Sequence, residues 1–167
     1  MNSSLRLMIM IIIVLITLSY LTPYFITTEA LPLNTKEFIV VDVRWVTSKG
    51  EKAIAPCDVV SLTIMLKYCG DSQVSELIAR LALPQRIVSY GGSEAIASYG
   101  GLISKSSPIV QLHYQLIVLS NTPIGVYYLT LTLDYDKLNI SSNSWVHKTE
   151  THDLVMFIVG RPNWISL

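Results

Sequence analysis

The chain has 167 residues, of which 51% are hydrophobic and 14% are charged, and its formal net charge is zero. The low charge excludes a disordered, highly charged chain. Because Lys and Arg are not in excess, a strongly basic nucleic-acid-binding protein is excluded too. A length of this order predicts one folded domain. The apolar residues are concentrated in the first 30 positions, so the composition describes a membrane-seeking N-terminus and a lightly charged body.

Residues 1–30 have the pattern of a targeting segment. Arg6 is the only charged residue before Glu29, and residues 7–26 are almost wholly apolar. A positive end followed by such a run is typical of a signal peptide, and the run is also long enough to cross a bilayer as a helix. Cleavage after Ala30 would release a secreted body, whereas an uncleaved segment would be a single transmembrane anchor. Both alternatives place residues 31–167 outside the cytoplasm, because the positive flank stays inside.

The body alternates between apolar and polar residues with a period of two, which is typical of half-buried strands. Within residues 59–67, the positions expected to face a core are Val60, Leu62, Ile64 and Leu66. The same pattern predicts strands at residues 77–83, 110–116 and 127–134, and further strands are expected at 38–46, at 154–159 and within 94–104. Residues 72–83 have the propensity of a short helix, but their alternation favours a strand.

Turn-forming residues separate these segments, as at residues 69–72 and 121–125. Residues 136–150 are polar and carry no periodic pattern, so they are predicted to form a loop. About seven short strands joined by turns predict an all-β fold. We expect an immunoglobulin-like antiparallel β-sandwich over residues 36–160, followed by a C-terminal tail at 161–167.

Two motifs of the body resemble those of a known family. Cys57-Asp58-Val59 through Lys67-Tyr68-Cys69-Gly70-Asp71-Ser72, followed by Leu81-Ala82-Leu83-Pro84, resembles that family's strand–turn–strand unit. Pro123-Ile124-Gly125-Val126-Tyr127 resembles its turn into a strand. The family is the archaeal S-layer-domain-like surface proteins, which are related to the CARDB adhesion-type modules. Two positions depart from its pattern: Cys57 stands where Gly is usual, and Tyr68 where Asn is usual.

The resemblance covers about residues 37–160 and rests on turns and alternation. It implies an extracellular β-sandwich that serves in spacing, adhesion or assembly, with no catalytic residues to transfer.

The two cysteines, Cys57 and Cys69, flank one predicted strand. An extended chain of that length would separate them by roughly 40 Å, whereas a disulfide needs Cα atoms within about 7 Å. We therefore expect no intrachain disulfide, although an exported protein would permit one. Two partly buried free thiols are the simplest expectation, and a disulfide between two chains is the alternative.

Residues suited to catalysis or metal binding are sparse. The one His–carboxylate cluster in the sequence consists of His147, Glu150, His152 and Asp153. The spacing of five puts the two His rings on opposite faces of a strand, so a solvated loop is expected rather than a metal site. His113 is expected on the polar face of its strand. No nucleophile elbow, phosphate-binding loop or zinc spacing occurs in the sequence. We expect no enzymatic activity, cofactor or metal.

Several residues are candidates for modification or contact. Asn139-Ile140-Ser141 is a glycosylation acceptor pattern in a region expected to face outward. Exposed aromatic residues can bind glycans or proteins, and the candidates, with simple packing as the alternative, are Tyr90, Tyr99, Trp145 and Trp164. Tyr127 follows a turn into a strand, where it either packs in the core or forms a tyrosine corner.

Two functions follow as hypotheses. The first is a non-catalytic cell-surface β-sandwich, held to the membrane by its N-terminal segment or secreted, that acts in cell-envelope structure, adhesion or assembly. The second is a glycan- or protein-binding accessory module of an exported transporter or hydrolase system. The expected partners are other cell-envelope proteins or glycans, and a homo-oligomer through open sheet edges is a further expectation. No nucleic acid is expected.

Overall fold

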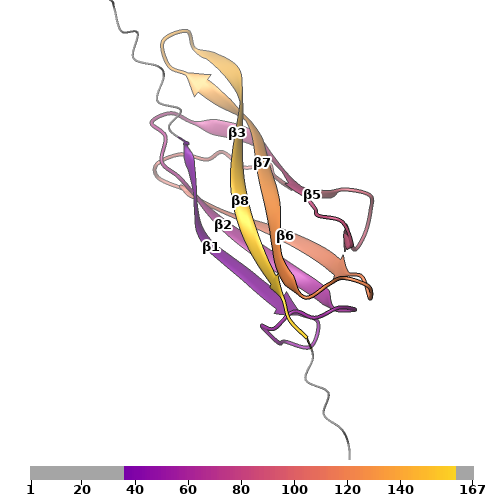
Figure 1. Ribbon diagram of the computed structural model, residues 1–167. Coiled ribbons are helices and arrows are strands. Elements are labelled where there is room, and N and C mark those ends of the chain that lie inside the picture. The colour runs from indigo at the N-terminus through magenta and orange to yellow at the C-terminus, as the bar shows by residue number, and fades with distance from the viewer. Residues whose placement is uncertain (1–35, 161–167) are drawn as a thin grey trace, which may run out of the picture. The chain divides into compact units, whose positions relative to one another are not determined.

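The computed structural model describes residues 36–160, which form eight β-strands (Figure 1). The strands are β1 (Phe38–Thr47), β2 (Val59–Tyr68), β3 (Val74–Ala82), β4 (Ile87–Ser89), β5 (Ala95–Tyr99), β6 (Ile109–Val118), β7 (Gly125–Asn139) and β8 (Ser144–Ile158). The predicted signal or anchor segment, Trp164 and the tail at 161–167 lie outside the described residues. Within residues 36–160, no helix is long and apolar enough to span a membrane.

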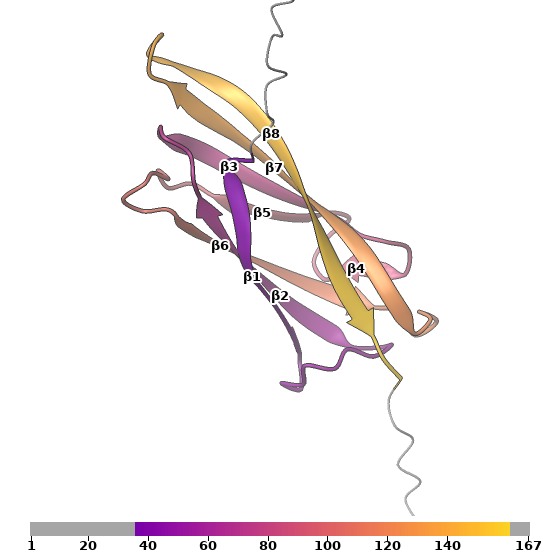
Figure 2. The same ribbon diagram turned by 60° about the vertical axis from the view of Figure 1, so that its left-hand side comes forward.

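The strands form two antiparallel sheets that pack face to face (Figure 2). The first sheet has the order β1-β2-β6-β4 and the second the order β5-β3-β7-β8. The prediction of an all-β fold with two antiparallel layers is therefore confirmed. The outermost strands are β1 and β4 in the first sheet and β5 and β8 in the second.

The core lies between the two sheets and is built from the alternation seen in the sequence. Every apolar residue predicted to face inward on β2 is buried, as are Leu129, Leu131 and Leu133 on β7. Because each strand contributes every second side chain to one layer, two sheets can close over a continuous apolar interior. Residues 72–83 contain β3, as their alternation predicted, with a bulge between Ser75 and Ile78.

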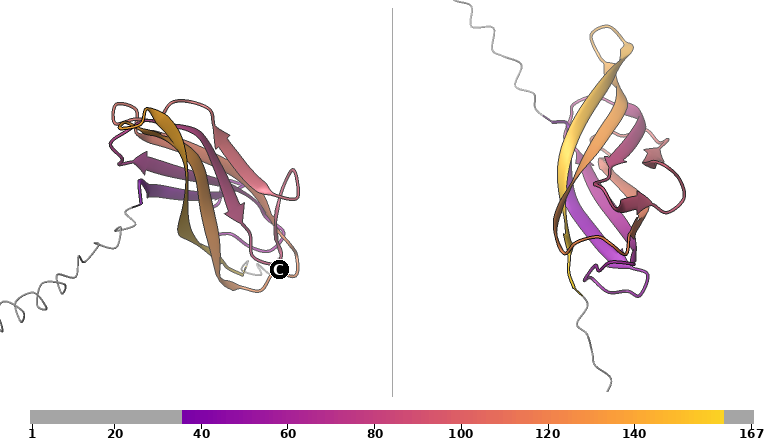
Figure 3. Two further views of the ribbon diagram at one scale, coloured as in Figure 1. Left: turned by 90° about the horizontal axis from the view of Figure 1, so that it is seen from above. Right: turned by 45° about the vertical axis from the view of Figure 1, so that its right-hand side comes forward.

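Two secondary-structure predictions are corrected. Strand β4 was not predicted, because three residues are too few to show a period. Residues 136–150 are not a loop: they continue β7 and β8 as a ladder that runs to the Asn139–Ser144 pair. Asp136 and Lys137 still pair with β3, but past them the hairpin extends beyond the neighbouring strands (Figures 1 and 3). No second layer imposes an apolar face on this end, so no alternation marks it.

Cys57 and Cys69 stand at opposite ends of β2, and both thiols are free. The expectation that they are partly buried is wrong, since both residues are exposed. Cys57 has a φ of 71° in the turn before the strand, which brings its backbone N–H to the carbonyl of Val118 at 2.9 Å.

The turn before β7 contains the tyrosine-corner contact that was one of two alternatives for Tyr127. Its hydroxyl donates a hydrogen bond to the carbonyl oxygen of Pro123 at 2.6 Å. The ring is half-buried and also packs against the core. One side chain thus joins the turn to the sandwich.

Candidate functional site

The outer face of the β7–β8 hairpin is the most distinctive surface of the described chain. Its cross-strand pairs, taken from the turn at residue 125 toward residue 139, are Val126–Phe157, Tyr128–Val155, Thr130–Asp153, Thr132–Thr151, Asp134–Thr149, Asp136–His147 and Leu138–Trp145. The partners on the other face, such as Leu129 and Leu154, point into the core. The ladder therefore runs from an apolar end through a polar centre.

We call the apolar end of this ladder the outer patch, comprising Val126, Tyr128, Val155 and Phe157. Tyr128 is 72% exposed and Phe157 is 62% exposed, and both valines are exposed as well. Single exposed apolar residues are ordinary, but adjacent ones gathered on one face are typical of interaction surfaces. Two cross-strand pairs side by side make this patch contiguous, so burying it against a partner would be favourable.

Hydroxyl and charged side chains form the centre of the same face. Arg80 on β3 pairs with Asp134 on β7, and Thr149 donates a hydrogen bond to the same carboxylate at 2.7 Å. Thr130 donates to Asp153 at 3.3 Å. Arg80 neutralises Asp134, whereas Asp153 gains a hydrogen bond and keeps its charge, so the surface beside the outer patch is polar and rich in hydroxyl groups.

Strand β8 also presents a sheet edge. It pairs with β7 on one side, and among residues 36–160 the partner on its other side is a parallel bridge at its end, where Ile54 pairs with Ile158. The Val159 N–H donates to the Ile54 carbonyl at 2.8 Å. The edge before this bridge is unpaired within the described chain, and unpaired backbone groups of a strand can accept a further strand.

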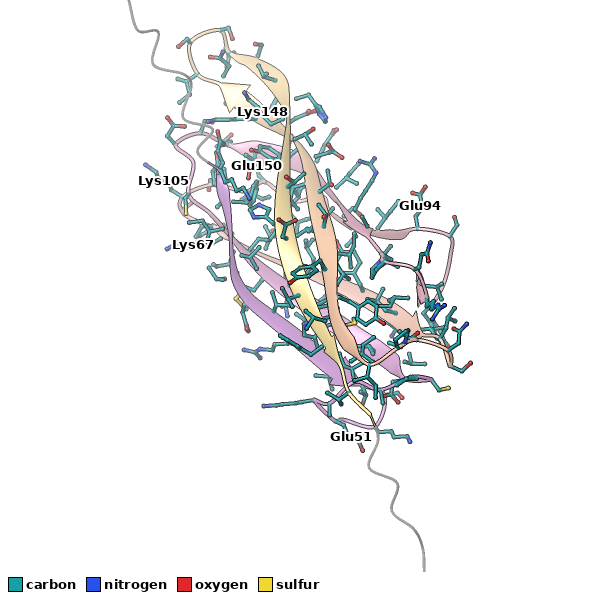
Figure 4. All side chains as sticks on the ribbon, viewed as in Figure 1. Glu51, Lys67, Glu94, Lys105, Lys148 and Glu150 are labelled. Carbon is teal, nitrogen blue, oxygen red and sulfur yellow. The ribbon has the colours of Figure 1, made fainter. Side chains whose placement is uncertain are left out.

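A polar cluster under β8 fixes this edge strand to β1. The Glu150 carboxylate accepts hydrogen bonds from the backbone N–H groups of Glu37 at 2.8 Å and Phe38 at 3.2 Å, and from the Tyr135 hydroxyl. Figure 4 shows Glu150 on β8 near the start of β1. Lys137 closes the cluster by donating to Glu37 at 2.7 Å. One carboxylate thus joins the outermost strands of the two sheets.

The surroundings of Glu150 set its protonation state. Burial alone would raise the pKa of this carboxyl, but the nearby His152 ring and the hydrogen bonds from Tyr135 and the two backbone N–H groups outweigh burial and lower the pKa. Burial, the hydrogen bond to Glu150 and its charge raise the pKa of Tyr135. The pair is therefore a carboxylate and a neutral phenol at neutral pH, which is a stable structural arrangement.

The predicted His–carboxylate cluster is divided between the two faces of β8. His147 lies on the outer face, with its Nδ1 atom 3.0 Å from Asp136 Oδ1. His152 is buried, with its Nε2 atom 3.6 Å from Glu150 Oε2. The prediction of opposite faces is confirmed, whereas the prediction of a solvated loop is wrong because these residues belong to a strand. Within residues 36–160, no three metal-ligating side chains gather into a possible ion site.

The other predicted site residues lie apart. Trp145 is on the outer face near the hairpin turn, whereas Tyr90 is exposed after β4 of the other sheet. Tyr99 is half-buried and packs against the core. These three residues therefore do not form one aromatic surface. His113 is exposed and bonds Thr63 across the sheet at 3.1 Å, which confirms its predicted place on the polar face.

Asn139 ends β7 and is exposed, as the acceptor pattern requires. Its Oδ1 atom accepts hydrogen bonds from the backbone N–H groups of Ser141 at 3.0 Å and Ser142 at 3.4 Å. The side chain therefore also shapes the turn between the two strands. Glycosylation of Asn139 stays a prediction.

Beside this turn, a hollow of about 380 Å³ is lined by Asp71, Lys137, Asn139, Val146 and Lys148, among others. Its charges are mixed, since Lys137 pairs with Asp71 at 3.2 Å as well as with Glu37. The hollow therefore lacks the concentrated charge of an ion-binding site.

Neither the outer patch nor the Glu150 cluster was predicted from the sequence. For the patch a signal existed: residues 154–159 are apolar at both inward and outward positions, which is unusual for a strand with one face in water. For the cluster no such signal existed, because residues 37, 135 and 150 meet only through the topology.

No protein-family model matches the chain, and no curated protein matches it. Among solved structures, the sporulation control protein Spo0M from Bacillus subtilis is similar, with 14% sequence identity and a TM-score of 0.32. The similarity covers 74% of this chain and 51% of Spo0M, so the chain spans about half the length of that protein. A similarity this distant supports no statement on family or function. The resemblance to S-layer-domain-like proteins stays a prediction.

Proposed function

We propose that this protein is a non-catalytic, immunoglobulin-like cell-surface β-sandwich that acts through protein–protein contact in cell-envelope structure, adhesion or assembly. The outer patch is the observation that carries the proposal. The N-terminal pattern supports the location, because a positive end followed by an apolar run is typical of a signal peptide or an anchor. The body then lies outside the cytoplasm, held by the anchor or secreted.

The chemistry of the hairpin face suits protein contact. Aromatic residues are enriched in the cores of interfaces and charged residues are depleted there, and the outer patch places Tyr128 and Phe157 beside two valines without a charged residue among them. The surrounding hydroxyl groups and internally paired charges can form a polar rim. The S-layer-like resemblance adds a surface role of the same kind.

The location is tested by adding a protease to intact cells that make the full chain. We expect cleavage or shaving of the chain without cell lysis, while a cytoplasmic marker protein stays intact. Full protection of the chain, with digestion only after lysis, would contradict the proposal.

The contact role is tested with isolated cell envelopes and the purified full chain. Tyr128→Ser combined with Phe157→Ser should reduce envelope binding at least tenfold, because both large apolar side chains are lost from the patch. The matched control is Thr130→Ser combined with Thr132→Ser, which changes two residues within the polar centre of the same face and should bind as the wild type does. Equal binding by the wild type and both variants would contradict a role of the outer patch in contact with the envelope.

A further inference from the structure

The edge of β8 that has no partner strand among residues 36–160 is long and directly borders the outer patch. It runs from Ser144 to Phe157, because the Ile54–Ile158 bridge occupies the last position. Natural proteins protect such edges by keeping them short, by placing Pro, a bulge or charged side chains in them, or by covering them. In β8 the inward charge of Glu150 is already bound within its own copy by Glu37, Phe38 and Tyr135. Strand β8 has 15 residues, its sequence contains no Pro, and its pairing with β7 is continuous along its whole length.

We propose that this edge pairs antiparallel with β8 of a second copy of the chain, about a two-fold axis at Thr151. The two four-stranded sheets would then become one sheet of eight strands. The proposal deepens the contact function proposed above, on which it rests, by naming the partner as a second copy.

The register follows from symmetry and from the sequence of the strand. Directly opposite residues of two antiparallel strands point to the same face of the sheet. A two-fold axis between the two copies of β8 must therefore lie at a residue position, not midway between two, so that inward residues face inward residues. An axis at Thr151 pairs every residue from Trp145 to Phe157 with its counterpart. It leaves out only Ser144, whose opposite position is the bridged Ile158. An axis at Glu150 or His152 would place a titratable side chain opposite its own copy.

The side chains brought together in this register are complementary. On the outer face, Trp145 lies opposite Phe157 of the second copy, and Thr149 lies opposite Asp153. Aromatic pairs stabilise adjacent strands, whereas like charges directly opposite destabilise them. The Thr149 hydroxyl keeps its hydrogen bond to Asp134 within each copy. No two like charges are opposed anywhere in the stretch. Each end of the shared strand pair thus adds an aromatic residue of one copy to the outer patch of the other.

The charge of the chain is compatible with such a self-association. The formal net charge is zero, so two copies approach without long-range repulsion. Arg80, Asp134 and Thr149 satisfy one another within each copy, so pairing of the strands does not bury an unpaired charge there.

Cysteine cross-linking at the axis tests the proposal on the full chain in membranes. In a background of Cys57→Ser and Cys69→Ser, Thr151→Cys places two thiols on directly opposite residues, whose Cα atoms are about 5 Å apart and within disulfide range. The matched control is Thr132→Cys, which faces Thr151 from the neighbouring strand and lies about 14 Å from its own copy at three strand spacings. We expect a disulfide-linked dimer with Thr151→Cys and little with Thr132→Cys.

A charge variant tests the same register without cross-linking. Thr151→Lys puts two ammonium groups opposite each other at the axis and should weaken self-association of the detergent-solubilised chain at least tenfold. Thr132→Lys carries the same charge change one strand away and should weaken it far less. The measurement is the dimer dissociation constant from sedimentation equilibrium, with thermal unfolding to verify that each variant is folded.

Equal cross-linking of the two cysteine variants, or a monomer at every concentration, would overturn the proposal. Cross-linking of Thr151→Cys to a different protein would overturn it too, while leaving the contact function intact. Conversely, protection of the chain from protease on intact cells would remove the surface role and leave the dimer standing.

Discussion

The two ends of the β7–β8 hairpin differ in burial and in their pattern of apolar and polar residues, although they belong to the same pair of strands. We call residues 125–135 with 150–158 the base and residues 136–149 the tip. In the base, alternate residues are buried under the other sheet, and every inward position from Leu129 to Tyr135 is buried. In the tip most residues are exposed or half-buried, and polar residues stand on both faces.

This difference shows what an alternation of apolar and polar residues indicates. A period of two in hydrophobicity indicates that one face of a strand packs on a core, and a strand without such packing need not show it. The tip is held by its cross-strand pairs, by the turn at Asn139 and by the Glu150 cluster where it joins the base. A ladder that leaves the core therefore looks like a loop in the sequence.

The largest expected effect comes from truncating an inward residue of the base. Leu131→Ala should lower the free energy of unfolding by about 2–5 kcal/mol, because it leaves a cavity between the sheets. The matched change in the tip, Val146→Ala, should cost no more than about 0.5 kcal/mol, since Val146 is exposed. Urea titration of the two variants and the wild type measures the difference. Equal losses would mean that the tip packs as the base does.

The junction between base and tip depends on Glu150. Glu150→Gln should lower the free energy of unfolding by about 1–3 kcal/mol, because a charged acceptor of two backbone N–H groups and a phenol becomes neutral.

The junction also makes stability depend on pH. The pKa of Glu150 is lowered on folding from its ordinary value of 4.5, so the folded protein binds fewer protons there than the unfolded chain does. The stability from this group is complete above about pH 4.5 and is lost as the pH falls through the lowered pKa. Glu150→Gln should flatten this acid limb in urea titrations at successive pH values. An unchanged acid limb in the variant would assign the pH dependence to other carboxylates.

A smaller effect is expected where the base meets its turn. Tyr127→Phe removes the hydrogen bond to the Pro123 carbonyl but keeps the packed ring, and should cost about 0.5–1 kcal/mol. Tyr127→Ala should cost clearly more because the ring is lost as well. A thermal unfolding series of the three proteins separates the hydroxyl from the ring, and a Phe variant as unstable as the Ala variant would contradict the expected packing.

The smallest effect is expected at the end of the tip, where two roles of one motif can be separated. Ser141→Ala removes the glycosylation pattern but keeps the backbone N–H that Asn139 accepts, so stability should change by less than about 0.5 kcal/mol. Asn139→Ala removes the pattern and the turn contact together and should cost about 0.5–1 kcal/mol. Mass spectrometry of protein from the native host shows whether either variant loses a glycan. An unchanged mass in both would mean that the motif serves only the turn.

The same reasoning explains which site residues were predictable. The opposite faces of His147 and His152 follow from a spacing of five on a strand, and the exposure of His113 follows from its polar neighbours. The buried position of His152 and the role of Glu150 were not predictable, since both depend on the start of β1 lying against Tyr135 and Glu150 of the hairpin. The outer patch was predictable in part, because residues 154–159 are apolar at the outward positions of the strand as well as at the inward ones.

By itself the sequence determined that the body is built of strands, which residues of those strands face the core, and that both cysteines lie at opposite ends of one strand. Those properties are local, because they depend on side-chain periodicity and on the reach of an extended chain. Only the tertiary structure decided which strands became sheet edges, how far β7 and β8 continue past the core, and that Glu150 reaches β1. Each of these depends on the order of strands in the two sheets, and strand order joins residues more than 100 positions apart that no local pattern connects.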